Sequence, residues 1–175
     1  FMSSEILGSL DDDQINVYRD IYKTLIHPVI EGECPGIIGI SIVQQKQLIS
    51  TFTFCKLIKE NFPKTHICLG GNIITRLREI IPEKKELFKL FDSAVVYEGE
   101  TAFLSLVNAL DQDKTDLSKL PNLIYRDNSG VHVNREVFAE DLAKLPPPDF
   151  DGLPLDKYFV PELILPYLAT RGCYW

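Results

Sequence analysis

The sequence contains no long apolar run, no cluster of basic residues and no leader-like start. A membrane-spanning helix needs about 18–20 consecutive apolar residues, and no segment approaches that length. Lysine and arginine total 18 against 25 aspartates and glutamates, so the net charge is −7 and phosphate backbones are poor partners. The first residues lack the basic and apolar regions of a signal peptide. We therefore expect a cytoplasmic protein whose partners include neither a membrane nor a nucleic acid.

Cysteines at metal-ligand spacing are also missing. The four cysteines are scattered, without a CxxC pair: Cys34, Cys55, Cys68 and Cys173. We expect the first three to be buried thiols in strands and helices. Neither a GxxxxGK phosphate loop nor a GxGxxG dinucleotide fingerprint is present. His27, His66 and His132 fall at a helix end, a strand start and a hairpin, where we expect structural or surface roles.

Two apolar patterns alternate along the first two thirds of the chain. Three- and four-residue apolar spacing predicts helices over residues 11–30, 48–62, 73–81, 84–91 and 102–110. Short apolar runs predict strands over 37–43, 65–69 and 93–97, and the first is typical of a parallel strand buried on both faces. Alternating strands and helices predict an α/β fold with a three-layer, Rossmann-like or flavodoxin-like parallel sheet. Because the pattern starts with a helix, we expect an opening strand upstream.

The pattern changes after Gln112. Strand-like residues 122–126 and 131–134 flank an Asp-Asn-Ser-Gly turn and predict a β-hairpin. The proline-rich stretch 145–150 predicts a stiff, extended linker, and a strand-like segment over 163–169 follows it. We predict an α/β domain over 1–115, the hairpin and linker over 116–165, and the start of a further domain at 166–175.

Three loops at one edge of the predicted sheet are the candidate site. Ligands of open parallel sheets bind outside the carboxyl ends of the strands, and loops 41–45, 70–72 and 97–101 all fall there. Two adjacent glycines at 70–71 permit a ligand or a neighbouring backbone to approach closely, and Asn72 is placed to cap the next helix near a bound anion. Ser41 either hydrogen-bonds a ligand or caps its own turn. Glu98 and Glu100 either face a ligand or stabilise a helix dipole.

Five segments, in order, resemble the cobalamin-binding-domain-containing radical SAM proteins: Pro35–Ser41, Leu69–Asn72, Val95–Thr101, Leu145–Asp149 and Thr170–Trp175. The resemblance covers residues 35–175. It implies the cobalamin-binding domain of a radical SAM enzyme, either a methyltransferase or another radical-based modifying enzyme. It also implies that cobalamin is held by loop residues at the carboxyl edge: Ser41, Ile42, Val43, Gln44, Gly70, Gly71, Asn72, Glu98, Gly99, Glu100 and Thr101.

The same resemblance implies a role for Cys173 as an iron–sulfur ligand. Cys173 matches the first cysteine of the CxxxCxxC motif that opens a radical SAM barrel, so residues 166–175 are expected to begin that barrel. Three such thiolates bind a 4Fe–4S cluster, and its open iron takes S-adenosylmethionine. These cofactors are expected of the parent enzyme only, with the barrel as partner of this domain. With one cluster cysteine, the 175 residues by themselves are expected to be inactive.

Two departures from the family pattern keep other interpretations open. Family members commonly have Gly-Glu-Gly-Glu where this chain has Tyr97-Glu98-Gly99-Glu100, and a tyrosine there would crowd the corrin or stack beside it. The axial-histidine motif DxHxxG is also missing from these residues. One alternative is a degenerate module that serves as a scaffold or presents a substrate without a cofactor. Another is a free-standing flavodoxin-like regulatory or small-molecule domain, which the linker and the Arg-Gly-Cys ending disfavour.

Overall fold

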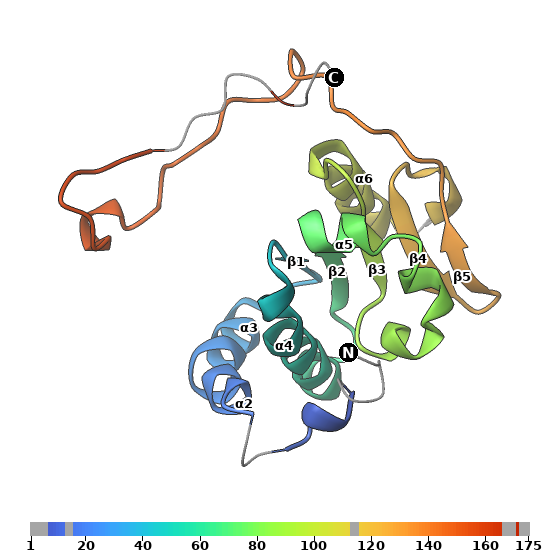
Figure 1. The fold of residues 1–175 in the computed structure, drawn as a ribbon, viewed down its shortest axis with the longest axis horizontal. Helices are drawn as coiled ribbons and strands as arrows, with labels where there is room; N and C mark the ends of the chain where they lie inside the picture. The colour runs from blue at the N-terminus through green and yellow to red at the C-terminus, as the bar shows by residue number, and fades with distance from the viewer. Residues whose placement is uncertain (1–6, 13–15, 113–115, 166–170, 172–175) are drawn as a thin grey trace. The chain divides into compact units, whose positions relative to one another are not determined.

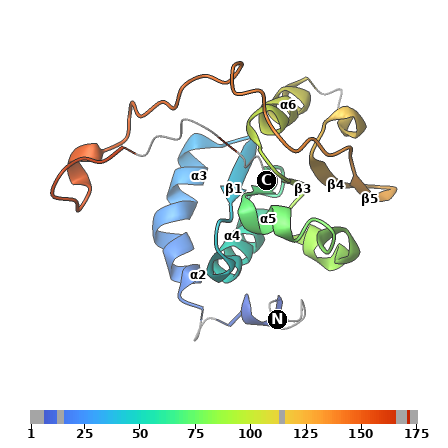
Figure 2. The ribbon, with the colours of Figure 1, turned by 45° about the horizontal axis from the view of Figure 1, so that its top comes forward.

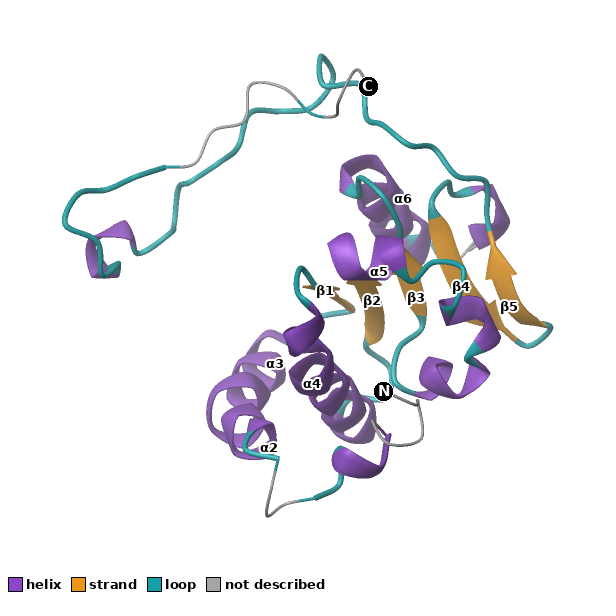
Figure 3. Ribbon diagram, viewed as in Figure 1, coloured by secondary structure: helices purple, strands orange, loops and turns teal. Residues whose placement is uncertain are grey.

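A single five-stranded sheet organises the first part of the chain (Figures 1 and 3). The computed structural model describes residues 7–12, 16–112, 116–165 and 171, in two units: Phe1–Phe138 and Ala139–Trp175. In the first unit the strands lie in the order β1-β2-β3-β4-β5. Their bounds are β1 Ile37–Ser41, β2 His66–Gly70, β3 Ser93–Val95, β4 Leu123–Asp127 and β5 Gly130–Val133. The first three strands are parallel, and β4 and β5 continue the sheet in antiparallel pairing.

Helices follow the strands much as the apolar spacing predicted. The α-helices are α2 Tyr18–Ile21, α3 His27–Glu33, α4 Leu48–Asn61, α5 Asn72–Arg76 and α6 Glu100–Asp111. Short 3-10 turns occupy Ile81–Glu83 and Lys85–Lys89, where the sequence predicted the end of one helix and a second helix. Within the described ranges, no helix combines the length and apolarity that crossing a membrane requires.

The first helical region differs from the prediction at both ends. It begins at Tyr18 rather than Asp11, and it continues through Pro28 to Glu33 instead of ending near Ile30. A π-helical segment, Tyr22–Ile26, joins α2 to α3 directly before the proline. Proline has no amide hydrogen to donate four residues back, so the widened turn accommodates it without ending the helix. Cys34, with a φ of 46°, stops α3 by donating its amide to Ile30.

The sheet is the middle layer of three, which confirms the predicted fold class. One face packs against the N-terminal helices and α4 through its buried side chains Ile67, Leu69, Ala94 and Ile124. The other face packs against α6 through Cys68, Val95, Leu123 and Tyr125. Neighbouring residues of one strand point to opposite faces, which is why consecutive apolar residues in β2 and β3 serve two cores. Figure 2 shows α4 and α6 on opposite sides of the strands.

The first strand is less buried than its composition predicted. Ile37, Ile38 and Ile40 are half-buried, while Gly39 and Ser41 are exposed. In contrast, β3 is buried along its whole length. The difference arises because β1 lies at the end of the described sheet, with β2 as its one neighbour there. An uninterrupted apolar run does not by itself distinguish a central strand from an edge strand.

The hairpin belongs to the sheet. It was predicted at the right residues, but with the linker rather than with the α/β domain. Val95 of β3 pairs with Leu123 of β4, so the first unit extends to Phe138. In the second unit, described over 139–165 and at Arg171, the chain is extended apart from turns and a 3-10 turn at Leu155–Lys157. Residues 163–165 form no strand, and the remainder of the predicted strand, 166–169, lies outside the described residues.

Polar side chains fasten the strands at the amino edge of the sheet. The Nε2 atom of His66 lies 2.8 Å from the Ser93 hydroxyl, which joins the starts of β2 and β3. Asp92 accepts the Ile67 amide at 2.7 Å and pairs with Lys59 at 2.6 Å. Burial lowers the pKa of His66; the Asp92 carboxylate opposes this and the Lys59 ammonium adds to it. The folded protein therefore favours the neutral imidazole.

This arrangement predicts that the protein loses stability as the pH falls below about 6.5, the value for an unperturbed histidine. There the unfolded chain takes up a proton that His66 resists in the folded state. The variant His66→Gln should show a smaller loss of unfolding free energy between pH 7 and pH 5.5, measured by urea denaturation. His27→Gln, outside this cluster, is the control. Equal pH slopes for His66→Gln and the unmodified chain would contradict the assignment.

Candidate functional site at the carboxyl edge of the sheet

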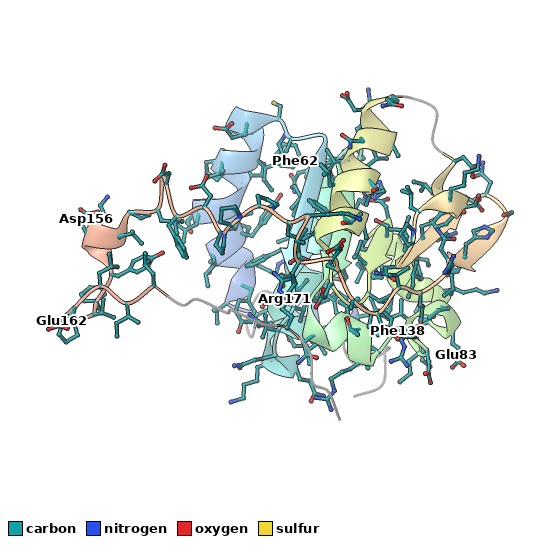
Figure 4. The ribbon with its side chains drawn as sticks, turned by 90° about the horizontal axis from the view of Figure 1, so that it is seen from above. Phe62, Glu83, Phe138, Asp156, Glu162 and Arg171 are labelled. Atoms are coloured by element: carbon teal, nitrogen blue, oxygen red, sulfur yellow. The ribbon has the colours of Figure 1, made fainter. Side chains whose placement is uncertain are left out.

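Strand register brings the predicted loops to one edge of the sheet. Ser41 is the direct partner of Gly70 across β1 and β2. Leu69 is the partner of Ala94, so the ends of β2 and β3 also adjoin. The sequence correctly predicted that these loops meet. Figure 4 looks down on this edge.

The loop after β1 is closed by one of its own side chains. The amides of Val43 and Gln44 both donate to the Oε1 atom of Gln47, each at 2.8 Å. These amides are therefore engaged within the chain. Sequence reasoning missed Gln47. Gln44 precedes a helical turn and Gln47 follows three residues later, which is the spacing of a capping box.

The predicted residues of this loop are not equally accessible. Ile42 is fully buried in the core, so its side chain serves packing and is removed from the edge. Ser41 is exposed, and Val43 has 56% of its surface exposed. Gln44 is exposed as well and takes part in the capping box with Gln47. Ser41 and Val43 are the predicted residues of this loop whose side chains are exposed outside that box.

The two adjacent glycines have different roles. A Cβ on Gly71 would lie 2.6 Å from the Ile42 carbonyl oxygen, and the φ of Gly71 is 93°. Gly71 is therefore required by the close approach of a neighbouring backbone, one of the two possibilities open at the sequence level. At Gly70 the nearest atom to such a Cβ is the Val95 carbonyl oxygen at 3.7 Å, an ordinary van der Waals contact, so a Cβ fits at this position.

Asn72 does not cap α5, contrary to the expectation. Gly71 is the residue that precedes the helix, and Asn72, exposed, is its first helical residue. The helix has five residues and so offers little dipole for an anion. The Ile73 amide donates to the Ile42 carbonyl at 3.0 Å, which ties α5 to the loop after β1.

The loop after β3 begins with Tyr97 in a left-handed conformation, with a φ of 60°. Its amide donates to the Thr75 hydroxyl at 2.8 Å, and its hydroxyl donates to Glu136 at 2.9 Å. The ring meets Phe138 edge-on at 4.9 Å, and the Arg78 guanidinium lies 5.5 Å from its centre. Burial, followed by the hydrogen bond to Glu136, raises the pKa of Tyr97. Sequence reasoning singled out Tyr97 but missed its three side-chain partners, which are far from it in sequence.

The rest of this loop leads into α6. Glu98 and Gly99 are half-buried, and Glu100 and Thr101 are exposed. Glu100 is the first residue of the helix, where a carboxylate stabilises the positive end of the helix dipole. The structure thus supports the dipole role for Glu100, and a ligand-binding role for these four residues stays a prediction.

Two of the three described cysteines are buried and the third is exposed. Cys55 and Cys68 are buried as predicted, and burial raises the pKa of their thiols to about 12 and about 11. The prediction was wrong for Cys34, which is exposed at the end of α3. Cys173, the predicted cluster ligand, lies outside the described residues. Over the described ranges, no three His, Cys, Asp or Glu side chains are grouped to hold a metal.

The donor set at this edge fits a large organic cofactor better than a metal ion or a phosphate. An exposed hydroxyl at Ser41, a glycine at position 70 and an exposed apolar side chain at Val43 lie at the adjacent ends of β1 and β2. Organic cofactor sites are lined mainly by apolar groups with a few placed polar atoms.

Comparison with known proteins gives relatives of two kinds. The chain is 27% identical over 171 residues to an uncharacterized methyltransferase of Pyrococcus horikoshii, a match that covers 97% of this chain and 35% of that protein. The radical S-adenosylmethionine methyltransferase TsrM of Kitasatospora setae, solved with cobalamin and a 4Fe–4S cluster bound, is 18% identical with a TM-score of 0.51. This match covers 82% of this chain and 28% of TsrM.

A second structure of TsrM, with its tryptophan substrate and a SAM analogue, matches with the same TM-score over 74% of this chain and 26% of TsrM. No family model matches the sequence. The chain thus spans about a third or less of the relatives it resembles. At this identity the structural likeness establishes the fold alone.

The geometry of the glycine pair predicts unequal effects of the same substitution. Gly71→Ala should lower the free energy of unfolding by about 2–4 kcal/mol, because its Cβ meets the Ile42 backbone at a positive φ. Gly70→Ala, the matched control, should change it by less than about 1 kcal/mol. Urea denaturation measures both values. Equal losses would show that the backbone contact does not constrain position 71.

Proposed function

We propose that this chain is the cobalamin-binding domain of a radical SAM methyltransferase or a related radical-based modifying enzyme. The observation that carries the proposal is the pairing of exposed Ser41 with Gly70, a position without a side chain, at the carboxyl edge of the parallel strands. Such an edge is where open α/β sheets bind their ligands. The fold shared with TsrM, which was solved with cobalamin, supports the same conclusion.

The residues that hold cobalamin in this proposal are a subset of those implied by family resemblance. Ser41 and Val43 contribute exposed side chains, and Gly70 contributes a position without a side chain. The segment from Glu98 to Thr101 faces the corrin side. Ile42 and Gly71 act indirectly, since their backbone contact fixes the distance between the first two loops. Bound methylcobalamin supplies a methyl group for transfer to a substrate radical.

The proposal extends to the parent enzyme through Cys173. That residue serves as the first ligand of a 4Fe–4S cluster in a following barrel, which also takes S-adenosylmethionine. The barrel is then the partner of this domain. The name of the Pyrococcus horikoshii relative supports methyl transfer as the reaction class.

A scaffold without cofactor is the second candidate, and Tyr97 is the observation that favours it. A bulky ring stands where cobalamin-binding relatives commonly have glycine, and its backbone keeps the left-handed conformation that suits glycine. In this alternative the loops keep the fold of the family while Tyr97 excludes the corrin.

The test is retention of a corrin by the 175-residue chain. After incubation with hydroxocobalamin and gel filtration, the protein fraction should carry the visible absorbance of the corrin. Gly70→Val should weaken retention at least about tenfold, because it adds a branched side chain beside Ser41 in the proposed site. Gly36→Val, at the exposed amino edge before β1, is the matched control and should retain the corrin.

Absence of corrin absorbance from the unmodified chain would favour the scaffold alternative. Equal retention by Gly70→Val and the unmodified chain would instead show that the corrin binds elsewhere than at the ends of β1 and β2. Circular dichroism of each variant establishes that the fold is intact before binding is compared.

A further inference from the structure

The segment that follows β5 lies beside the start of β4, at the carboxyl edge of the parallel strands. We call residues 134–138 the strap. The Asn134 amide donates to the Leu123 carbonyl at 3.0 Å, and the Asn122 amide donates to the Arg135 carbonyl at 2.9 Å. The Asn122 side chain then binds both backbone groups of Val137, accepting its amide at 2.6 Å and donating to its carbonyl at 2.9 Å. Because Asn122 also bonds Val96 at the end of β3, the strap is fixed beside the loop that carries Tyr97.

Tyr97 joins the strap to the candidate site. Its hydroxyl donates to Glu136, whose other carboxylate oxygen lies 3.5 Å from the Arg78 Nε atom. Arg78 follows α5, and its guanidinium also lies over the tyrosine ring. Three segments distant in sequence therefore meet at this side chain: the end of α5, the loop after β3 and the strap.

The backbone conformation of Tyr97 indicates that its contacts with Glu136 and Arg78 are functional. A left-handed conformation is unfavourable for a residue with a side chain, whereas glycine adopts it without that cost. The strain is held by the hydrogen bond from its amide to Thr75 and by the three side-chain contacts. Strained residues held by their surroundings concentrate at functional sites.

Phe138 gives the joined segments an apolar surface. Its ring meets Tyr97 edge-on, at 84°, yet 68% of the residue remains exposed. Figure 4 labels Phe138 at the end of the strap, as seen from above. Val43, which follows β1, is a further exposed apolar residue at this edge of the sheet.

We propose that Tyr97, held by Glu136 and Arg78, positions Phe138 as one wall of the ligand site, against which the flat ring of a corrin packs. This inference rests on the proposed cobalamin function and assigns Tyr97 a role opposite to exclusion. Tyr97 is a positioning residue, and Phe138 is the residue that contacts the ligand. Aromatic side chains pack favourably against flat conjugated rings. In this proposal the corrin covers the exposed face of Phe138.

The test uses the 175-residue chain with hydroxocobalamin as the probe, and two readouts. Phe138→Ala should weaken corrin binding about tenfold, through the loss of one ring contact. Tyr97→Phe keeps the ring and loses the hydroxyl, so it should weaken binding about fivefold and, without ligand, speed amide hydrogen exchange in the strap. The controls are Phe159→Ala and Tyr158→Phe in the second unit, where both aromatic side chains are exposed. These should change neither corrin binding nor exchange.

The outcomes separate this inference from the function on which it rests. Equal corrin binding by the unmodified chain, Phe138→Ala and Tyr97→Phe would overturn the wall while leaving the cobalamin function in place. Corrin binding by Tyr97→Gly but not by the unmodified chain would overturn the wall and establish Tyr97 as a blocking residue. No corrin binding by any of these proteins would overturn both proposals.

Discussion

The contact between Gly71 and the Ile42 backbone is the constraint on which the carboxyl edge depends. The Ile42 amide donates to the Gly70 carbonyl at 2.8 Å, and the Ile42 carbonyl accepts the Ile73 amide. No side chain fits between these backbones, so glycine at 71 is a steric requirement. The contact sets the start of α5, and α5 in turn carries Thr75, which holds the Tyr97 backbone. The spacing of all three loops follows from it.

The two edges of the sheet differ in how their polar groups are used. At the amino edge, His66 contacts Ser93, and Asp92 is engaged by both Lys59 and a backbone amide. Those groups satisfy one another and fasten the strands. At the carboxyl edge, Ser41 and Val43 are exposed and Gly70 has no side chain. This asymmetry is typical of parallel α/β sheets, in which one edge supports the fold and the other meets ligands.

Tyr97 shows how contacts between distant segments hold one residue in a strained loop. Its φ of 60° is left-handed, a conformation that favours glycine. The ring finds partners in Glu136, Phe138 and Arg78, all of which belong to other segments. Whether the proposed corrin site is walled or blocked by this side chain depends on contacts that lie outside the matching motif.

The sequence by itself determined the three parallel strands, the main helices and the edge that the three loops share, because apolar periodicity is a local property and alternating strands and helices imply parallel strands. Only the tertiary structure decided that Ser41 and Gly70 are direct partners, that β1 is half-buried and that the hairpin extends the sheet. It also decided that Gly71 serves a backbone contact while a Cβ would fit at Gly70. The partners of Tyr97 were equally out of reach, since Arg78 and Glu136 meet it only after the chain has folded. Contacts between segments distant in sequence leave no periodic signal in the sequence itself.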